Sequence, residues 1–184
     1  MRHLTRVALP FCLAVLFGAC ADESDAPTAP LIEASAALGS ARTVERPLTG
    51  SCHTTYEIFD FEFLPPPLQD VPVRATIRHT GTCLLSHLGA TQLVKEEVID
   101  FTVTPAHIDG ILTLTAANGD RLSGTEGSEV QPPDEEGAFS FVGRWRFRGG
   151  TGRFQAAEGL AWFVGSGETV DNTTDRTLSG RLTF

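Results

Sequence analysis

A two-residue alternation of apolar and polar side chains constrains the fold of this chain more than any other feature. It is clearest in Ala138–Arg148, where four aromatic residues share one parity and three arginines share the other. These residues are Phe139, Phe141, Trp145 and Phe147 on one face, and Arg144, Arg146 and Arg148 on the other. Because successive side chains of a β-strand point to opposite faces, the segment is predicted to be a strand. We expect the aromatic face to form core or ligand-pocket wall. The arginines are expected to pair with carboxylates of neighbouring strands, and binding of an anion is the alternative.

Seven other runs are also predicted to be strands, which makes about eight in total. The predicted strands are Thr49–Leu64, Val71–Leu85, Gln92–Thr104, Ile111–Ala116, Arg121–Val130, Ala138–Arg148, Leu160–Gly165 and Thr177–Phe184. Asn118-Gly119 lies between two of them and predicts a hairpin with a type I′ turn. No long amphipathic helix is present. Short strands with turns at close intervals predict an antiparallel sandwich or barrel.

The first predicted strand carries a second aromatic set. Phe59 and Phe61 share one parity, while Asp60 and Glu62 share the other. This alternation predicts that the two phenylalanines face inward, where they would join the aromatic set of Ala138–Arg148 as ligand-pocket candidates.

A glycine cluster follows the arginine-bearing strand and carries a family resemblance. Gly149-Gly150-Thr151-Gly152-Arg153-Phe154 is followed by Ala157, Gly159 and Ala161. This pattern resembles that of the dirigent and allene oxide cyclase-like β-barrel group. The resemblance implies a closed antiparallel β-barrel of about eight strands over residues 49–184.

The same resemblance implies a site inside the barrel, because members of that group steer reactive small molecules with a few polar residues in an apolar cavity. Glu57 has the parity of Phe59 and Phe61 and is the first candidate for an inward-facing acid, and Glu158 is the second. Neither residue lies on a catalytic motif of the group. His53, His79 and His107 are interpreted as surface or turn residues.

Two cysteines lie in the predicted barrel. Export would place Cys52 and Cys83 in an oxidising compartment, where a disulfide between them is favoured and would contribute roughly 3–4 kcal/mol. The alternative is a metal site, because His79, Cys83 and His87 are spaced four apart. Positions four apart on a strand are separated by ~13 Å, which is too far to share one ion, so no metal is expected.

The N-terminal residues predict export. Arg2 and Arg6 precede an apolar run, Val7–Ala19, which is too short for a membrane-spanning helix and is typical of a signal peptide over residues 1–20. The run ends in a lipobox-like sequence before Cys20. Ordinary cleavage at the Ala19-Cys20-Ala21 sequence and a free thiol are the alternatives, but lipidation of Cys20 is favoured because a polar tether, residues 21–48, follows directly. This tether is rich in alanine, serine, proline and acidic residues, and it is expected to be disordered.

The charge of the chain bears on its partners. Beyond Cys20 the chain keeps 12 basic and 23 acidic residues, which gives a net charge of −11. Such a surface argues against binding to nucleic acid, where lysine and arginine supply most of the affinity. Contact with a membrane is expected only through a lipid anchor. The oligomeric state is left open.

No motif for a catalytic triad, a phosphate-binding loop or a cofactor is found, so no cofactor is expected. Three hypotheses for a cell-envelope protein remain. The favoured one is binding of a small apolar ligand or a partner without catalysis. The others are a cyclase or isomerase of the allene oxide cyclase type, and a structural protein whose barrel is filled by side chains. A cavity would argue against the last, and a buried carboxylate of shifted pKa in that cavity would favour the second.

Overall fold

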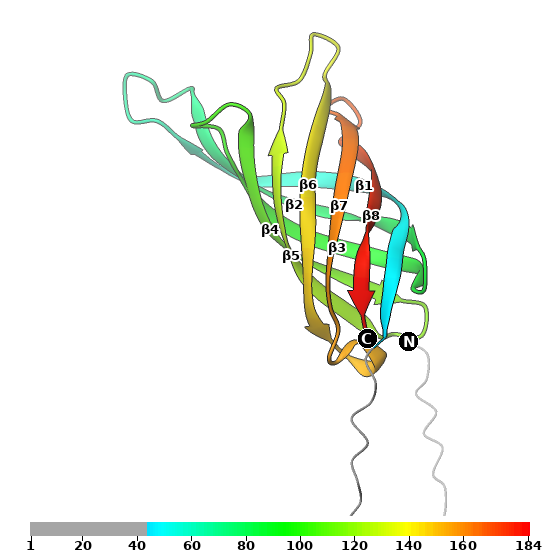
Figure 1. The fold of residues 1–184 in the computed structure, drawn as a ribbon. Coiled ribbons are helices and arrows are strands. Elements are labelled where there is room, and N and C mark those ends of the chain that lie inside the picture. Colours follow the sequence, from blue (N-terminus) through cyan, green and yellow to red (C-terminus); the bar gives the residue numbers. More distant parts are fainter. Residues whose placement is uncertain (1–43) are drawn as a thin grey trace, which may run out of the picture. The chain divides into compact units, whose positions relative to one another are not determined.

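Eight strands follow one another around a closed antiparallel barrel, and the last strand returns to pair with the first (Figure 1). The strands are β1 (Glu45–Phe63), β2 (Pro72–Leu85), β3 (Gly89–Asp100), β4 (Ala106–Ala116), β5 (Arg121–Val130), β6 (Ala138–Gly150), β7 (Glu158–Glu168) and β8 (Thr173–Thr183). The closed antiparallel barrel predicted from the sequence is therefore confirmed.

This computed structural model describes residues 44–184. The predicted signal peptide, the lipidation site Cys20 and residues 21–43 of the predicted tether lie outside the described residues. The barrel begins earlier than the predicted boundary at Thr49, because β1 starts at Glu45 and Leu48 is buried in the core. No helix within residues 44–184 is long and apolar enough to cross a membrane.

The two ends of the barrel differ. Three connections lie at the end where β1 begins and β8 finishes, which we call the closed end, and the connection between β6 and β7 contains the 3-10 helix η1 (Gly152–Phe154) (Figure 1). The other four connections lie at the opposite end, which we call the loop end. These connections are residues 64–71, 101–105, 131–137 and 169–172.

The glycine cluster shapes the closed end. A Cβ on Gly150 would lie 1.9 Å from the carbonyl oxygen of Arg121, and one on Gly152 would lie 1.8 Å from Oδ1 of Asp120. Gly152 also has a φ of 57°, which favours glycine. The tight turn directs η1 across the barrel, where the fully buried ring of Phe154 closes this end.

The hairpin between β4 and β5 is confirmed, but its turn differs from the predicted type I′. The N–H of Gly119 donates to the carbonyl of Ala116 over 2.9 Å, so the turn spans Ala116–Gly119. Gly119 has a positive φ of 87°, whereas Asn118 does not. A type I′ turn needs a positive φ at both of its central residues, and this turn lacks them.

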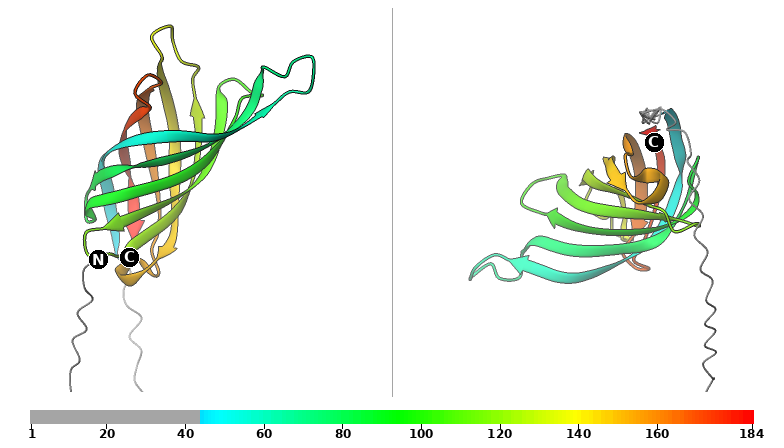
Figure 2. Two further views of the ribbon diagram at one scale, coloured as in Figure 1. Left: turned by 180° about the vertical axis from the view of Figure 1, so that it is seen from behind. Right: turned by 90° about the horizontal axis from the view of Figure 1, so that it is seen from below.

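The end of β1 leaves the barrel wall. Its pairing with β8 stops at Thr55, whereas its pairing with β2 continues to Phe63 with a shift of register between Ile58 and Asp60. The far half of β1 therefore has only β2 beside it, and the hairpin projects beyond the neighbouring strands in both views of Figure 2. The shift of register also changes which face of β1 each residue occupies.

The disulfide between Cys52 and Cys83 is confirmed. The two residues are directly opposite each other in the β1–β2 register, and both are buried. The bond therefore joins the first two strands inside the barrel.

Apolar side chains fill the barrel unevenly. A large cluster occupies the closed end and includes Leu114, Leu122, Phe147 and Phe154, which are almost fully buried. A second, smaller cluster lies toward the loop end and consists of Ala75, Ile77, Ile99 and Ile108. The interior is therefore solid at one end, and buried polar residues lie between the two clusters.

Candidate functional site

A cavity of about 320 Å³ lies toward the loop end of the barrel. Its walls are mostly apolar and come from β1 to β6 and from the 101–105 and 131–137 connections. The apolar lining is Tyr56, Ile58, Ile77, Ile99, Phe101, Val103, Ala106, Ile108, Val130, Pro132, Pro133, Phe139 and Phe141. The volume equals that of roughly ten water molecules, so a ligand of about ten non-hydrogen atoms fits.

The floor of the cavity is polar. Seven side chains from β1, β2, β3, β5 and β8 form a closed circuit of hydrogen bonds and ion pairs across the barrel, which we call the buried polar ring. Its members are Thr54, His79, Lys95, Glu97, Glu126, Thr174 and Arg176. Each of them is at most 4% exposed, and all except Thr54 line the cavity.

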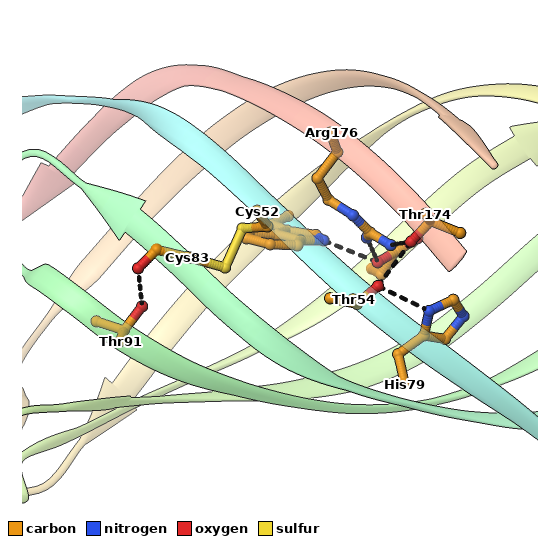
Figure 3. The surroundings of a disulfide bond; sticks show 9 residues. Cys52, Thr54, His79, Cys83, Thr91, Thr174 and Arg176 are labelled. Carbon is orange, nitrogen blue, oxygen red and sulfur yellow. Dashed lines mark hydrogen bonds and ion pairs between the residues drawn. A yellow bond between two sulfur atoms is a disulfide. The ribbon is translucent and has the colours of Figure 1, made fainter. Parts of the chain in front are cut away.

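One half of the ring is a chain of hydrogen bonds, most of which is visible in Figure 3. Arg176 Nη2 donates to Thr174 Oγ1 over 3.2 Å, and the Thr174 and Thr54 hydroxyl oxygens are 2.6 Å apart. Thr54 Oγ1 lies 3.3 Å from Nδ1 of His79, whose Nε2 lies 2.8 Å from Oε1 of Glu97. The chain thus links a guanidinium to a carboxylate through three uncharged side chains.

The protonation of these groups follows from their partners. An ionised carboxylate only accepts hydrogen bonds, so Nε2 of His79 carries a proton and donates a hydrogen bond to Glu97. In a neutral imidazole, Nδ1 is then an acceptor, and Thr54 must donate to it. The Thr54 oxygen in turn accepts from Thr174, which accepts from Arg176. Every donor in this half of the ring therefore has a defined direction.

The other half of the ring consists of ion pairs. The Lys95 ammonium contacts Oε2 of Glu97, and it lies 3.1 Å from Oε1 and 3.0 Å from Oε2 of Glu126. Glu126 also lies 3.4 Å from Nη1 of Arg176, which closes the circuit. Trp145 Nε1 donates to Glu126 over 2.8 Å, so this carboxylate has both oxygens occupied.

The ring is electrically balanced. Burial raises the pKa of the Glu97 carboxyl, but the Lys95 ammonium and the His79 hydrogen bond outweigh burial and hold this pKa well below its ordinary value. Burial, together with the charge of Lys95, lowers the pKa of the His79 imidazole. The ring therefore combines two cations and two carboxylates with a neutral histidine, and its net charge is zero.

Arg176 separates the cavity from the solid end of the barrel. Its guanidinium carbon lies 5.1 Å from the ring centroid of Phe141, 5.6 Å from that of Trp145 and 5.5 Å from that of Phe163. Such cation–π contacts favour a buried guanidinium. They also hold Arg176 in place, because three aromatic rings surround it.

The aromatic pocket candidates divide into three groups. Phe139 and Phe141 line the cavity as predicted. Trp145 and Phe147 are buried but are not among the cavity-lining residues; Trp145 instead bonds to the ring. The inward placement of Phe59 and Phe61 is wrong, since they are 54% and 43% exposed.

The failure at Phe59 and Phe61 has a physical cause. Phe59 is the extra residue at the shift of register, so it has no partner in β2. Phe61 pairs with the buried Ala75, but at that point β1 has already left the barrel wall. Parity read along β1 therefore does not predict burial beyond Ile58.

The candidate acids do not face the cavity. Glu57 is exposed and lies opposite Arg78 on the outer face, and Glu158 is exposed at the start of β7. The inward placement of Glu57 is wrong because its parity was taken from Phe59 and Phe61. The buried carboxylates are instead Glu97 and Glu126.

The histidines also divide. His53 and His107 are exposed and lie beside Asp175 and Asp109, as expected for surface residues. The interpretation of His79 as a surface or turn residue is wrong, because it is buried in the ring.

The arginines of β6 lie on the outer face as predicted, but their expected pairing with carboxylates is wrong. Within residues 44–184, Arg144, Arg146 and Arg148 form no ion pair. The guanidinium of Arg144 instead lies 5.8 Å from the ring centroid of Trp162 on β7. A flat apolar neighbour takes the place of the expected carboxylate.

Sequence reasoning missed the ring, although a signal for part of it was present. Lys95 and Glu97 share the parity of Leu93 and Ile99, and this parity faces inward. Arg176 likewise shares the parity of Leu178 on β8, but the predicted strand began one residue after it. The inward parity of these charged residues was not considered in predicting the site, although buried charges are rare and therefore informative.

The described part of the chain contains no group of three or more histidine, cysteine or acidic residues arranged to hold a metal ion. Comparison with family models, with curated proteins and with solved structures found no match to this chain.

Proposed function

We propose that this protein binds a small, mainly apolar ligand inside the barrel without transforming it. The observation that carries the proposal is the cavity of about 320 Å³, whose walls are apolar and whose floor is a ring of paired polar groups. Ligand sites in proteins are commonly apolar cavities with a few placed polar groups. A barrel that served only a structural role would gain stability by filling this space, because cavities destabilise a fold.

Binding is favoured over an isomerase or cyclase by the state of the buried carboxylates. Two observations support catalysis, namely the burial of these carboxylates in an apolar cavity and the shifted pKa of Glu97. However, the pKa of Glu97 is lowered rather than raised, its Oε1 is bonded to His79, and its Oε2 lies against the Lys95 ammonium without accepting a hydrogen bond from any described residue. A general base works best with a pKa near the working pH and with a free oxygen. Glu97 meets neither condition.

The sequence features bear on where the proposed binding protein is located. With the predicted signal peptide and lipidation at Cys20, the proposed binding protein would lie in the cell envelope, tethered through the residues between Cys20 and β1. The resemblance of the glycine cluster to the dirigent and allene oxide cyclase-like group agrees with a small-molecule cavity. The location in the cell envelope and the lipid anchor are therefore part of the proposal.

Native mass spectrometry of protein purified gently from its own envelope tests the proposal. We expect a co-purifying small molecule that is lost on denaturation. Ala106 lines the cavity, so the Ala106→Trp variant should lose the ligand. Ala90 is exposed on β3, so Ala90→Trp is the matched control and should keep it. A bare wild-type mass, or equal occupancy in both variants, would refute binding in this cavity.

A further inference from the structure

We propose that the cavity selects an uncharged ligand that carries one terminal hydrogen-bond acceptor, and that it rejects carboxylates and amines with the same apolar body. This inference rests on the proposed function and specifies its ligand class. The geometry that carries it is the closed circuit of the buried polar ring, which forms the floor of the cavity.

The charged groups of the ring are already paired with one another. Each carboxylate of the ring is bound by a cation, with Glu97 against Lys95 and Glu126 against both Lys95 and Arg176. Both cations are therefore already paired with carboxylates of the ring, so a ligand carboxylate would add an uncompensated negative charge to the floor. In the described part of the chain, Oε2 of Glu97 accepts no hydrogen bond but contacts the Lys95 ammonium, so a ligand ammonium would add an uncompensated positive charge beside Lys95. An ion brought to this floor would be buried without a partner, which is strongly unfavourable.

The Arg176 guanidinium has hydrogen-bond donors that the ring does not use. A guanidinium has five N–H donors. Arg176 directs one to Glu126 and one to Thr174, and its buried Nε has no partner within the described residues. Arg176 also lines the cavity, so its remaining Nη hydrogens can meet a neutral acceptor such as a hydroxyl or carbonyl oxygen. The floor thus offers donors but no net charge.

Among the described residues, the walls of the cavity carry no charged side chain outside the ring. The lining above the ring includes Ile77, Ile99, Ile108, Phe139 and Phe141, none of which carries a polar side-chain group. The other wall residues with polar side chains are Tyr56, Thr104, Gln131 and Thr169. They are uncharged, so a charged group finds no ionic partner along these walls. We expect the ligand to place its acceptor at the floor and its apolar body among the apolar side chains.

The experiment measures the affinities of octanol, octanoate and octylammonium for the purified protein by isothermal titration calorimetry at pH 8, where His79 is neutral. The three compounds share one alkyl chain and differ in charge. We expect octanol to bind at least ten-fold more tightly than either ion. Octanoate or octylammonium binding as tightly as octanol would overturn the inference while leaving the proposed function intact. Failure of all three to bind would refute the proposed function, and the inference with it.

A charge-altering variant tests the cause of the selectivity. Glu97→Gln removes one negative charge and leaves the ring with a net charge of +1. We expect this variant to bind octanoate at least ten-fold more tightly, relative to octanol, than the wild type does. Glu96→Gln is the matched control, because Glu96 is the neighbouring residue on the outer face, and it should leave the ratio unchanged. An unchanged ratio in folded Glu97→Gln would overturn the electrostatic argument, and the wild-type series decides the inference if that variant does not fold.

Discussion

Replacement of Lys95 by methionine tests whether the ring is held by charge balance. The ammonium lies 3.0 Å from Glu126 and also contacts Glu97, so the substitution leaves two buried carboxylates with only Arg176 as a cation. At an effective dielectric constant near 20, one contact of this length carries about 5.5 kcal/mol of attraction. Removal of one partner from a buried pair costs about 3–5 kcal/mol, because the remaining charge is uncompensated. We expect Lys95→Met to lose stability in this range.

Urea unfolding at pH 7 measures the loss. Arg78→Met is the control, because Arg78 pairs with Glu96 on the surface, where both side chains are about half exposed and such a pair contributes at most about 1 kcal/mol. The double variant Lys95→Met/Glu97→Gln restores the charge balance, so it should be more stable than Lys95→Met alone. A double variant that is less stable than Lys95→Met would show that packing, rather than charge, dominates, and a loss equal to that of Arg78→Met would also refute the reasoning.

Three other predictions concern the ring and the frame around it. The pKa of His79 is lowered in the folded state, so the unfolded chain binds more protons and stability should fall as the pH drops below about 6.5. A His79→Gln variant should flatten this part of a plot of melting temperature against pH. A variant with the wild-type profile would contradict the prediction. Replacement of Cys52 and Cys83 by serine should lower the free energy of unfolding by roughly 3–4 kcal/mol, as measured in urea, because the disulfide closes a long loop; no measurable loss would count against this role. Gly150→Ala should also destabilise the barrel, because a Cβ would lie 1.9 Å from the Arg121 carbonyl oxygen, and wild-type unfolding behaviour would show that the close approach is relaxed at no cost.

Local alternation was sufficient to predict the strands. Phe139, Phe141, Trp145 and Phe147 all face inward because they lie on one side of a strand whose pairing with β7 has no shift of register from Ala138 to Arg148. The hairpin at Asn118-Gly119 and the pairing of the two barrel cysteines were also predictable. These features depend on residues close in sequence, or on a choice among very few partners.

Parity was insufficient where pairing became irregular. The shift of register at Phe59 leaves that residue unpaired, and the end of β8 pairing at Thr55 leaves Phe61 beyond the barrel wall, so both residues are exposed for reasons that depend on other strands. A bulge changes the face of every later residue, and nothing in the local alternation marks its position.

The candidate site shows the same division. The inward parity of Lys95 and Glu97 was present in the sequence, although it was not used to predict a site. That Lys95 meets Glu126, and that Arg176 meets the same carboxylate, was decided by the closure of the barrel, which brings β3, β5 and β8 to one level. A strand pattern specifies which way a side chain points, whereas the partner that the side chain meets depends on the register between strands. The sequence by itself therefore determined the barrel, and the tertiary structure decided the site inside it.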